Sequence, residues 1–270
     1  MIEKVIVFIF GSLVGSFLNT CIYRMPLGES VVWPRSYCPK CKKKIRGYDN
    51  IPLISYILLR ARCRSCKQRI SFRYFIVELL TATMFLAIYS LYGLTYDFFF
   101  YIVLVCILMV ATFVDIGHRI IPDEVSVGGM ILGFILSSVK GFSSNPVVFN
   151  YKPLMDSFLG IITGGGILYL TGALFDLVYF KLLKKPPIQG ETQSMGGGDV
   201  KLLAMIGAFL GWQKALMVFF ISPFLGAIIG IINLLVRKDH TIPFGPFLSL
   251  SAIIVLFWAD KILQMVFIMP

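Results

Sequence analysis

Long apolar runs separated by short polar stretches dominate the chain, and eight of these runs have the length or composition of buried helices. They cover residues 2–22, 74–94, 97–114, 124–140, 154–180, 200–212, 214–236 and 247–269. A helix needs about 20 residues to cross the hydrocarbon core, so the run at 200–212 is short for a complete crossing. Backbone groups inside lipid must be satisfied within the segment, and we therefore expect helices throughout. The pattern predicts an all-α polytopic membrane bundle of about eight spans.

The composition supports the same fold class. Hydrophobic residues make up 57% of the chain and charged residues 14%, and the mean hydropathy is +0.84. A soluble domain would expose too much apolar surface at this composition, so we expect the lipid bilayer to be the solvent of most of the chain.

The positive charge is concentrated in one loop. Residues 24–73 contain 13 Lys or Arg and 2 Asp or Glu, which accounts for the whole net charge of +11. Short loops rich in Lys and Arg stay on the cytoplasmic side of a membrane, so we interpret this loop as a topology signal rather than a nucleic-acid site. Counting crossings from it places the end of the third span, near residue 115, and the loop at 181–199 on the cytoplasmic side as well.

Three segments follow from this count. Residues 1–23 form the first transmembrane span, residues 24–73 form a basic cytoplasmic loop domain, and residues 74–270 form the remaining transmembrane bundle. The protein is therefore predicted to be a multi-pass protein of the cytoplasmic membrane.

Four cysteines in the basic loop have the spacing of a metal site. They form two C-x-x-C pairs, Cys38 with Cys41 and Cys63 with Cys66. Thiolates in such paired motifs can hold zinc tetrahedrally, and the surrounding lysines and arginines favour the thiolate form. Redox-active or disulfide pairs and unpaired thiols are the alternatives. A site with four cysteine ligands has no open position, so a zinc ion there would be structural, in a small zinc-ribbon-like domain.

Five acidic residues stand out within or at the ends of the apolar runs: Glu78, Asp115, Asp176, Asp199 and Asp260, the last of which adjoins Lys261 and can pair with it. Ionisable groups at membrane depth are costly, and their usual explanation is function. Glu78 has a structural alternative, an ion pair with a base of the loop. Asp115 ends an unbroken apolar run, and Asp199 follows three glycines at the start of another.

Asp115 and Asp199 are predicted to lie on the same side of the membrane. Two carboxylates at one depth can share a proton, so that one activates water while the other protonates a leaving amine. This is the chemistry of an aspartic protease, and we expect no metal in that site. Glycines 196–198 would let a substrate strand approach the backbone closely.

Two other classes of function remain open. In a transporter or channel, Asp115, Asp176 and Asp199 would form a proton or ion relay through the bilayer. In a membrane scaffold, the cysteine loop would bind zinc without any chemistry. A relay distributes its acids over the depth of the membrane, whereas Asp115 and Asp199 are predicted at one boundary.

Taken in order, the motifs resemble the type IV prepilin peptidases, which are bifunctional leader peptidases and N-methyltransferases of the GxGD aspartic protease group. The resemblance covers nearly the whole chain and includes both C-x-x-C pairs. The matching segments are "GSFLNTCIYRMP" (15–26), "SFRYFIVELLTA" (71–82), "VDIGHRIIPD" (114–123), "GGGDVKLLAMIGAFLGW" (196–212) and "IPFGPFLSLSA" (242–252).

The resemblance implies that Asp115 and Asp199 are the catalytic pair and that the four cysteines bind zinc. It also implies cleavage of a short basic leader from type IV prepilins or pseudopilins, followed by methylation of the new N-terminal amine with S-adenosylmethionine. The sequence contains no glycine-rich Rossmann fingerprint for this donor, so its binding residues are unknown at this point. Glu78 and the basic loop are the weak candidates.

Overall fold

The computed structural model describes residues 1–143, 150–183, 195–237 and 243–266, and this part of the chain is helical. All eight predicted runs form helices in it, and extended pairing there is limited to two isolated bridges in the cysteine loop. The all-α prediction is confirmed. The helices are α1 (Ile2–Arg24), α2 (Ile54–Leu58), α3 (Phe72–Tyr92), α4 (Tyr96–His118), α5 (Asp123–Ser143), α6 (Lys152–Asp176), α7 (Gly197–Leu210), α8 (Trp212–Arg237) and α9 (Gly245–Val266).

Six helical segments of the described chain are long and apolar enough to cross a membrane. They are Ile2–Leu27, Phe72–Tyr92, Tyr96–His118, Asp123–Phe142, Lys152–Leu182 and Trp212–Ile232. The other two predicted spans are shorter: α7 has 14 residues, and the described apolar part of α9 is Gly245–Ala259. The chain is therefore a multi-pass membrane protein in which α7 does not have the length of a complete crossing. Most of the predicted 181–199 loop, residues 184–194, lies outside the described residues.

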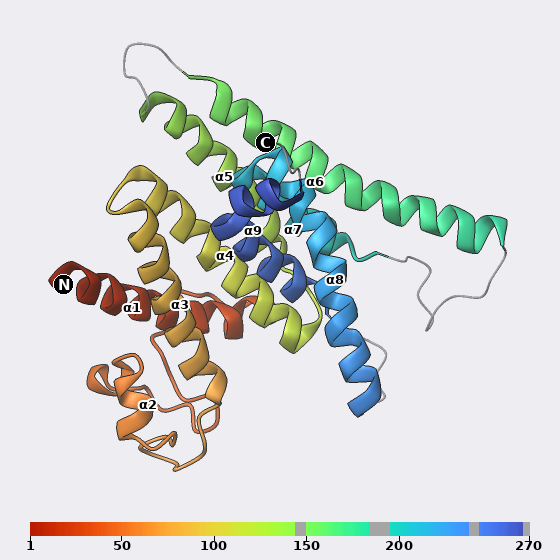
Figure 1. Cartoon of the computed structure of the whole chain (residues 1–270). Helices are drawn as coiled ribbons and strands as arrows, with labels where there is room; N and C mark the ends of the chain where they lie inside the picture. The colour runs from red at the N-terminus through yellow and green to blue at the C-terminus, as the bar shows by residue number, and fades with distance from the viewer. Residues whose placement is uncertain (144–149, 184–194, 238–242, 267–270) are drawn as a thin grey trace. The chain divides into compact units, whose positions relative to one another are not determined.

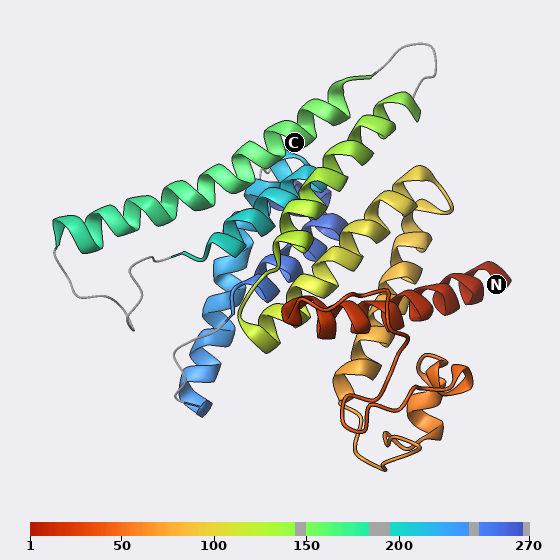
Figure 2. The ribbon, with the colours of Figure 1, turned by 180° about the vertical axis from the view of Figure 1, so that it is seen from behind.

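The chain divides into two compact units, Met1–Val114 and Asp115–Pro270. In the first unit, α1 packs along α3, and the cysteine loop with the short helix α2 connects them (Figures 1 and 2). A Cβ built at Gly15 of α1 would lie 2.8 Å from the Cα of Glu78, so the two backbones are in close contact at this point. Glu78 at this crossing contacts the loop that follows α1, because its Oε2 accepts a hydrogen bond from the Leu53 N–H.

In the second unit, α7 is the central helix. It packs against α5, α6, α8 and α9, and every residue from Leu202 to Leu210 is buried. A helix that is apolar on all sides requires such an environment, because no face of it suits water. Four neighbouring helices therefore surround α7. This protein environment stabilises a helix that is too short to cross a membrane by itself.

The closest packing in the second unit joins α6 to α7 through glycine. A Cβ built at Gly160 would lie 2.0 Å from the carbonyl oxygen of Gly207, so no side chain fits between the two backbones. Small residues at a helix crossing in a membrane allow this approach and the van der Waals contact that stabilises it.

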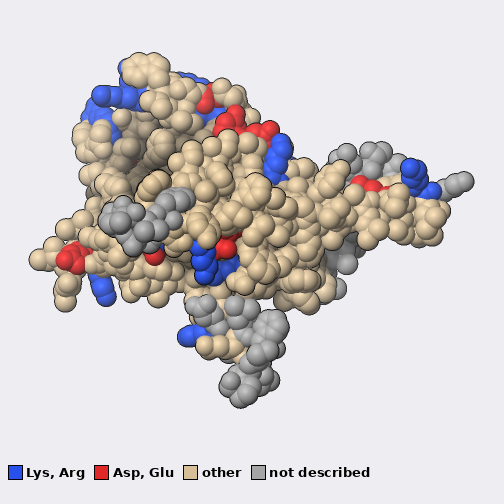
Figure 3. Space-filling view, turned by 90° about the horizontal axis from the view of Figure 1, so that it is seen from above, with Lys and Arg blue, Asp and Glu red and all other residues tan. Residues whose placement is uncertain are grey.

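The outer faces of these helices are apolar. Large exposed hydrophobic side chains follow α6, including Phe158, Ile162, Tyr169 and Leu170. In the space-filling view, Lys, Arg, Asp and Glu form small groups separated by broad areas without charge (Figure 3). Apolar surface of this extent is unsuited to water and is consistent with contact to lipid.

The glycine contact predicts a strong asymmetry between two alanine substitutions in α6. Gly160→Ala is expected to destabilise the protein by about 1–3 kcal/mol, because the added methyl group overlaps the backbone of α7. Gly166→Ala is the matched control, since its Cβ would meet nothing within 4 Å. Thermal unfolding in detergent measures the difference, and equal melting temperatures for the two variants would contradict the packing described here.

Candidate active site and metal centre

Asp115 lies in the last turn of α4, where the chain leaves the helix. Arg119 has a left-handed φ of 56° and donates its N–H to the Asp115 carbonyl over 2.8 Å, which ends the helix there. Pro122 then precedes the first turn of α5, where it cannot break an intrahelical hydrogen bond. The Asp115 side chain is 6% exposed, and its Oδ2 accepts a hydrogen bond of 2.9 Å from the Gly245 N–H.

Asp199 lies in the first turn of α7 and is half-buried. Gly196 precedes this helix in an extended conformation, and its carbonyl accepts the N–H of Asp199 over 3.1 Å. A Cβ built at Gly196 would lie 3.1 Å from Asp199 Oδ2, so the carboxylate lies close to the glycine backbone. The sequence prediction that glycines deliver this acid to the start of a helix is therefore consistent with its position.

The second unit brings Asp115 and Asp199 into one region. The two carboxylates are close enough to interact electrostatically. Ile121 lies between their supporting backbones: a Cβ at Gly198 would be 3.2 Å from Ile121 Cβ, and one at Gly245 would be 3.2 Å from Ile121 Cδ1. Residues from α4, the α4–α5 connection, α7 and α9 thus meet around two acids. Such an arrangement can activate water with one carboxyl group and donate a proton with the other.

An ion pair joins the start of α7 to the start of α5 near these two acids. Lys201 Nζ lies 2.6 Å from Asp123 Oδ1, which joins the first turn of α7 to the first turn of α5. Both side chains are substantially exposed, so the contribution of this ion pair to stability is small. Asp123 also occupies the first turn of α5, where a helix favours negative charge.

Two further acids have different surroundings. Asp176 is the last residue of α6 and is half-buried. Glu78 belongs to the first unit, where it is 7% exposed and its Oε2 accepts a hydrogen bond of 2.8 Å from the Leu53 N–H. The alternative of an ion pair with a base of the loop is not among the ion pairs seen in the described part of the chain.

The four cysteines meet in the first unit. Their sulfur atoms all lie within 4.8 Å of one another, and the Sγ atoms of Cys38 and Cys66 are 3.9 Å apart. Tetrahedral zinc with bonds of about 2.3 Å would place its sulfur ligands about 3.8 Å apart. The side chains therefore fit a four-thiolate metal ion, and all four are free thiols here.

The two cysteine pairs occupy a repeated local structure. Residues 37–45 ("YCPKCKKKI") and 62–70 ("RCRSCKQRI") share the pattern C-x-x-C-K-x-x-I. In each, the first cysteine donates its N–H to the carbonyl five residues later, over 3.0 and 2.9 Å. The lysine that follows the second cysteine has a φ of 57° in both copies, at Lys42 and Lys67. The shared sequence pattern C-x-x-C-K-x-x-I indicates this repeated structure.

Backbone donors favour the thiolate at one of these cysteines. Hydrogen bonds from the backbone of Cys66 and then of Ser65 lower the pKa of Cys63 to about 7. The hydrogen bond from the Gln68 backbone lowers the pKa of Cys66, but burial and hydrogen bonds with the other cysteines outweigh it and raise this pKa to about 11. The thiolate, which is the form that binds a metal ion, is therefore favoured at Cys63.

Three residues that lie at the aspartate pair or at the loop belong to the motifs but were not candidates on their own. Gly245, whose N–H contacts Asp115, lies in "IPFGPFLSLSA", and the buried Asn19 and Arg24 lie in "GSFLNTCIYRMP". None is a titratable group with an obvious role in catalysis, so residue type alone gave no signal. Their importance comes from which atoms they place beside the acids and the loop.

Comparison with known proteins gives matches over both halves of the chain. Residues 9–92 match the bacterial peptidase A24 N-terminal domain, and residues 102–231 match the type IV leader peptidase family. The first match contains the four cysteines, and the second contains Asp115 and Asp199. No solved structure matches the chain.

Curated relatives cover most of the sequence. A protein of Aeromonas salmonicida (strain A449) is 34% identical over 95% of this chain and 91% of its own length. One from Legionella pneumophila is 33% identical over 96% and 92%. One from Myxococcus xanthus (strain DK1622) is 38% identical over 86% of this chain, which spans 63% of that longer protein. All three are named prepilin leader peptidase/N-methyltransferase.

The geometry of the cysteine cluster predicts binding of about one zinc ion per chain. Cys38→Ser is expected to remove this zinc and to lower the melting temperature, because the small loop has little hydrophobic core of its own. Metal analysis of the purified protein, together with thermal unfolding, measures both effects. Cys106→Ser in α4 is the control and should keep its zinc. Retention of the metal by Cys38→Ser would rule out this cluster as the site.

Proposed function

Because the chain belongs to the type IV leader peptidase family, we propose that it cleaves the basic leader from type IV prepilins or pseudopilins at the cytoplasmic boundary of the membrane. The names of its relatives support this substrate class. The single observation that carries the proposal is the convergence of Asp115 and Asp199 within the second unit.

Cleavage requires a water molecule made nucleophilic and a leaving amine that gains a proton. Two interacting carboxyl groups supply both when they hold one proton between them. The ionised member takes a proton from the water as it attacks the scissile carbonyl, and the protonated member gives its proton to the leaving nitrogen. The half-buried position of Asp199 leaves one side of the pair accessible to a peptide, while Gly245 fixes the orientation of Asp115.

The second proposed activity is methylation of the amine that cleavage exposes, with S-adenosylmethionine as the methyl donor. The relatives carry this activity in their names. A product of leader cleavage has a free N-terminal amine, which is the nucleophile that methyl transfer needs. The relay and scaffold alternatives have no comparable support, because family membership favours peptidase chemistry for the two aspartates.

We place the protein in the inner membrane with its cysteine loop and its aspartates facing the cytoplasm. The charge of residues 24–73 supports this orientation, since short basic loops remain on that side. The same orientation puts the catalytic pair at the side where a basic leader would be retained. The structural role proposed for the zinc ion follows from its four protein ligands.

Replacement of either aspartate is expected to stop leader removal. Asp115→Asn and Asp199→Asn should each lower the cleavage rate by roughly 10²–10⁴-fold, since each removes one half of the proton-transfer pair. Mass spectrometry of a purified prepilin incubated with the protein reports the cleaved product. Asp156→Asn is the control, because Asp156 adjoins Gly211 at the opposite end of α7. Normal cleavage by either active-site variant would refute the proposed mechanism.

The orientation can be tested with a maleimide that does not cross membranes. In intact cells, the wild-type cysteine loop should remain unlabelled because it faces the cytoplasm. Leu94→Cys should be labelled, because Leu94 is 63% exposed in the turn between α3 and α4, on the predicted outer side. Permeabilised cells treated with a zinc chelator, which frees the loop thiols, provide the positive control for the loop. Labelling of the wild-type protein in intact cells would reverse the proposed topology.

A further inference from the structure

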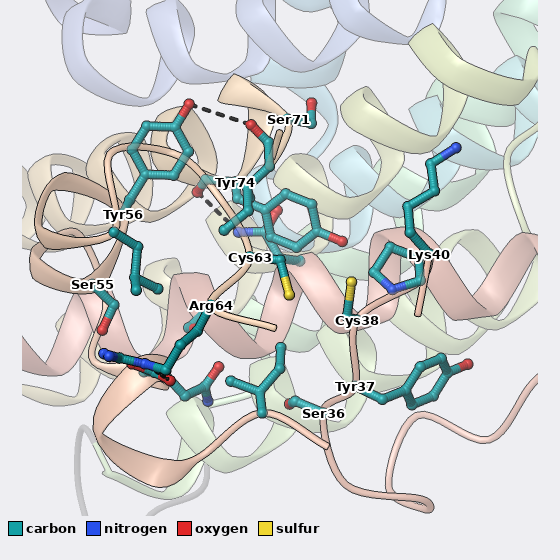
Figure 4. A pocket seen from close by; sticks show the side chains of 18 of the residues that line it. Ser36, Tyr37, Cys38, Lys40, Ser55, Tyr56, Cys63, Arg64, Ser71 and Tyr74 are labelled. Carbon is teal, nitrogen blue, oxygen red and sulfur yellow. Dashed lines mark hydrogen bonds and ion pairs between the residues drawn. The ribbon is translucent and has the colours of Figure 1, made fainter. Parts of the chain in front are cut away.

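The short helix α2, in the loop that joins α1 to α3, has two unlike sides. Ser55 and Tyr56 line a cavity of about 510 Å³ in the first unit (Figure 4). Ile54, Ile57 and Leu58 do not belong to the described lining, and they are 54%, 64% and 77% exposed. Residues separated by three and four positions share one side of a helix. The outer side of α2 is therefore a small surface of three exposed aliphatic side chains.

Contacts with α3 fix where this aliphatic surface lies in the first unit. The centroid of the Tyr56 ring is 6.3 Å from that of Phe72 and 5.5 Å from that of Phe75. The Tyr56 hydroxyl also donates to the Ile70 carbonyl over 3.5 Å (Figure 4). Phe72 is the first residue of α3 and of a segment long and apolar enough to cross a membrane, and it is 59% exposed. The aliphatic surface thus adjoins the end of a span, where hydrocarbon gives way to lipid headgroups.

The sequence around α2 carries only positive charge. Residues 51–77 contain six Lys or Arg and no Asp or Glu. Among them, Arg60, Arg62 and Arg69 are exposed, and they follow α2 directly or belong to the cysteine turn at residues 62–70. Exposed cations beside an apolar surface are complementary to an anionic partner that also offers apolar contact.

The cavity on the inner side of α2 has the same excess of positive charge. Eight Lys or Arg and two acids, Asp49 and Glu78, contribute to its lining. Within that lining, Arg24, Asn19 and Glu78 are buried. Both sides of α2 therefore lie in a positive environment, and a cationic segment such as a basic leader is an unfavourable partner for the outer side, because like charges repel.

A lipid surface has both of the required properties. Apolar side chains next to Lys or Arg are typical of segments that lie in the membrane interface. The cytoplasmic leaflet contains anionic lipids, which attract basic groups next to a membrane span. In addition, α1 and α3 tether α2 to the end of their own spans, so the bilayer is present at a high effective concentration.

We propose that α2 is an interfacial anchor for the cysteine loop. Ile54, Ile57 and Leu58 insert among the lipid headgroups beside the Phe72 ring, and the neighbouring arginines bind lipid phosphates. The leaflet is the cytoplasmic one by the orientation proposed above. The contact itself depends neither on leader cleavage nor on methyl transfer.

The anchor is joined directly to one of the two cysteine turns. Ala61 donates its N–H to the Tyr56 carbonyl over 2.9 Å, and the Ala61 carbonyl accepts the Ile70 N–H over 2.7 Å. These bonds connect α2 to both ends of the turn at residues 62–70. Contact of α2 with lipid therefore holds this cysteine turn at the membrane surface.

Photochemical cross-linking of the full-length protein in phosphatidylglycerol nanodiscs tests the anchor. The photoreactive residue p-benzoylphenylalanine in place of Leu58 should react with lipid acyl chains, and mass spectrometry identifies the adduct. The same probe in place of Lys40, an exposed residue of the other cysteine turn, is the matched control. We expect at least about fivefold more acyl-chain adduct at Leu58 than at Lys40, because an inserted apolar side chain is surrounded by lipid.

The probe at Leu58 replaces a side chain that is 77% exposed, so we expect this variant to fold. Leu170, which is 65% exposed on α6, provides the positive control for a lipid-facing position. Equal adduct yields at Leu58 and Lys40 would overturn the proposal. An adduct that joins Leu58 to a second copy of the chain in place of lipid would also overturn it.

Lipid charge tests the contribution of the arginines. In phosphatidylcholine nanodiscs the yield at Leu58 should fall at least about twofold, because the arginines lose their anionic partner. The yield at Leu170 should be the same in both lipids. Equal yields at Leu58 in the two lipids would overturn the pairing of the arginines with lipid phosphates.

A second measurement uses only the wild-type protein and so does not depend on the folding of a variant. Amide hydrogen exchange at residues 54–60 should be slower in phosphatidylglycerol than in phosphatidylcholine nanodiscs. Residues 93–95, in the turn between α3 and α4, contain no Lys or Arg and are the internal control. The same exchange rate at residues 54–60 in both lipids would contradict the anchor. Leader cleavage measured on the same samples separates the hypotheses, since intact prepilin would contradict the peptidase function and leave the lipid contact standing.

Discussion

The hydrogen bond from the Gly245 N–H to Asp115 is the contact on which the candidate active site depends. A carboxylate at the end of an apolar helix is costly to bury unless a donor satisfies it, and here the first turn of α9 supplies that donor. The N-terminal amides of a helix have no partner within the helix, so the same bond satisfies an otherwise open N–H. It fixes one acid of the pair and joins the end of α4 to the beginning of α9.

The second acid depends on packing rather than on a single bond. Asp199 begins the central helix α7, whose position is set by burial on several sides and by the glycine contact with α6. Because the backbones of α6 and α7 touch at Gly160 and Gly207, a shift of α7 along its axis would bring larger groups into the crossing. The position of Asp199 therefore depends on the contact between Gly160 and Gly207, which lies near the other end of α7.

The first unit differs in how its loop is stabilised. Its cysteine loop has many positive charges and few apolar side chains, so two repeated cysteine turns and the adjoining ends of α1 and α3 hold it together. The result is a cavity with buried groups of both charge signs, next to four cysteines whose sulfur atoms are close enough to hold one metal ion. The cysteine cluster and the two aspartates thus belong to different compact units.

The sequence by itself determined the helical class and the approximate helices, and it singled out the cysteine cluster and the two aspartates, because apolar run length, cysteine spacing and acids at membrane depth are local properties. The donor for Asp115, the Ile121 contact that links the surroundings of the two acids, and the cavity around Glu78 and Asn19 were decided only by the tertiary structure. Each of these unites atoms from segments distant in the chain, and Gly245 or Asn19 has no chemistry of its own that signals such a role. The residue type sets the chemistry of a side chain, whereas the tertiary packing sets which atoms it contacts.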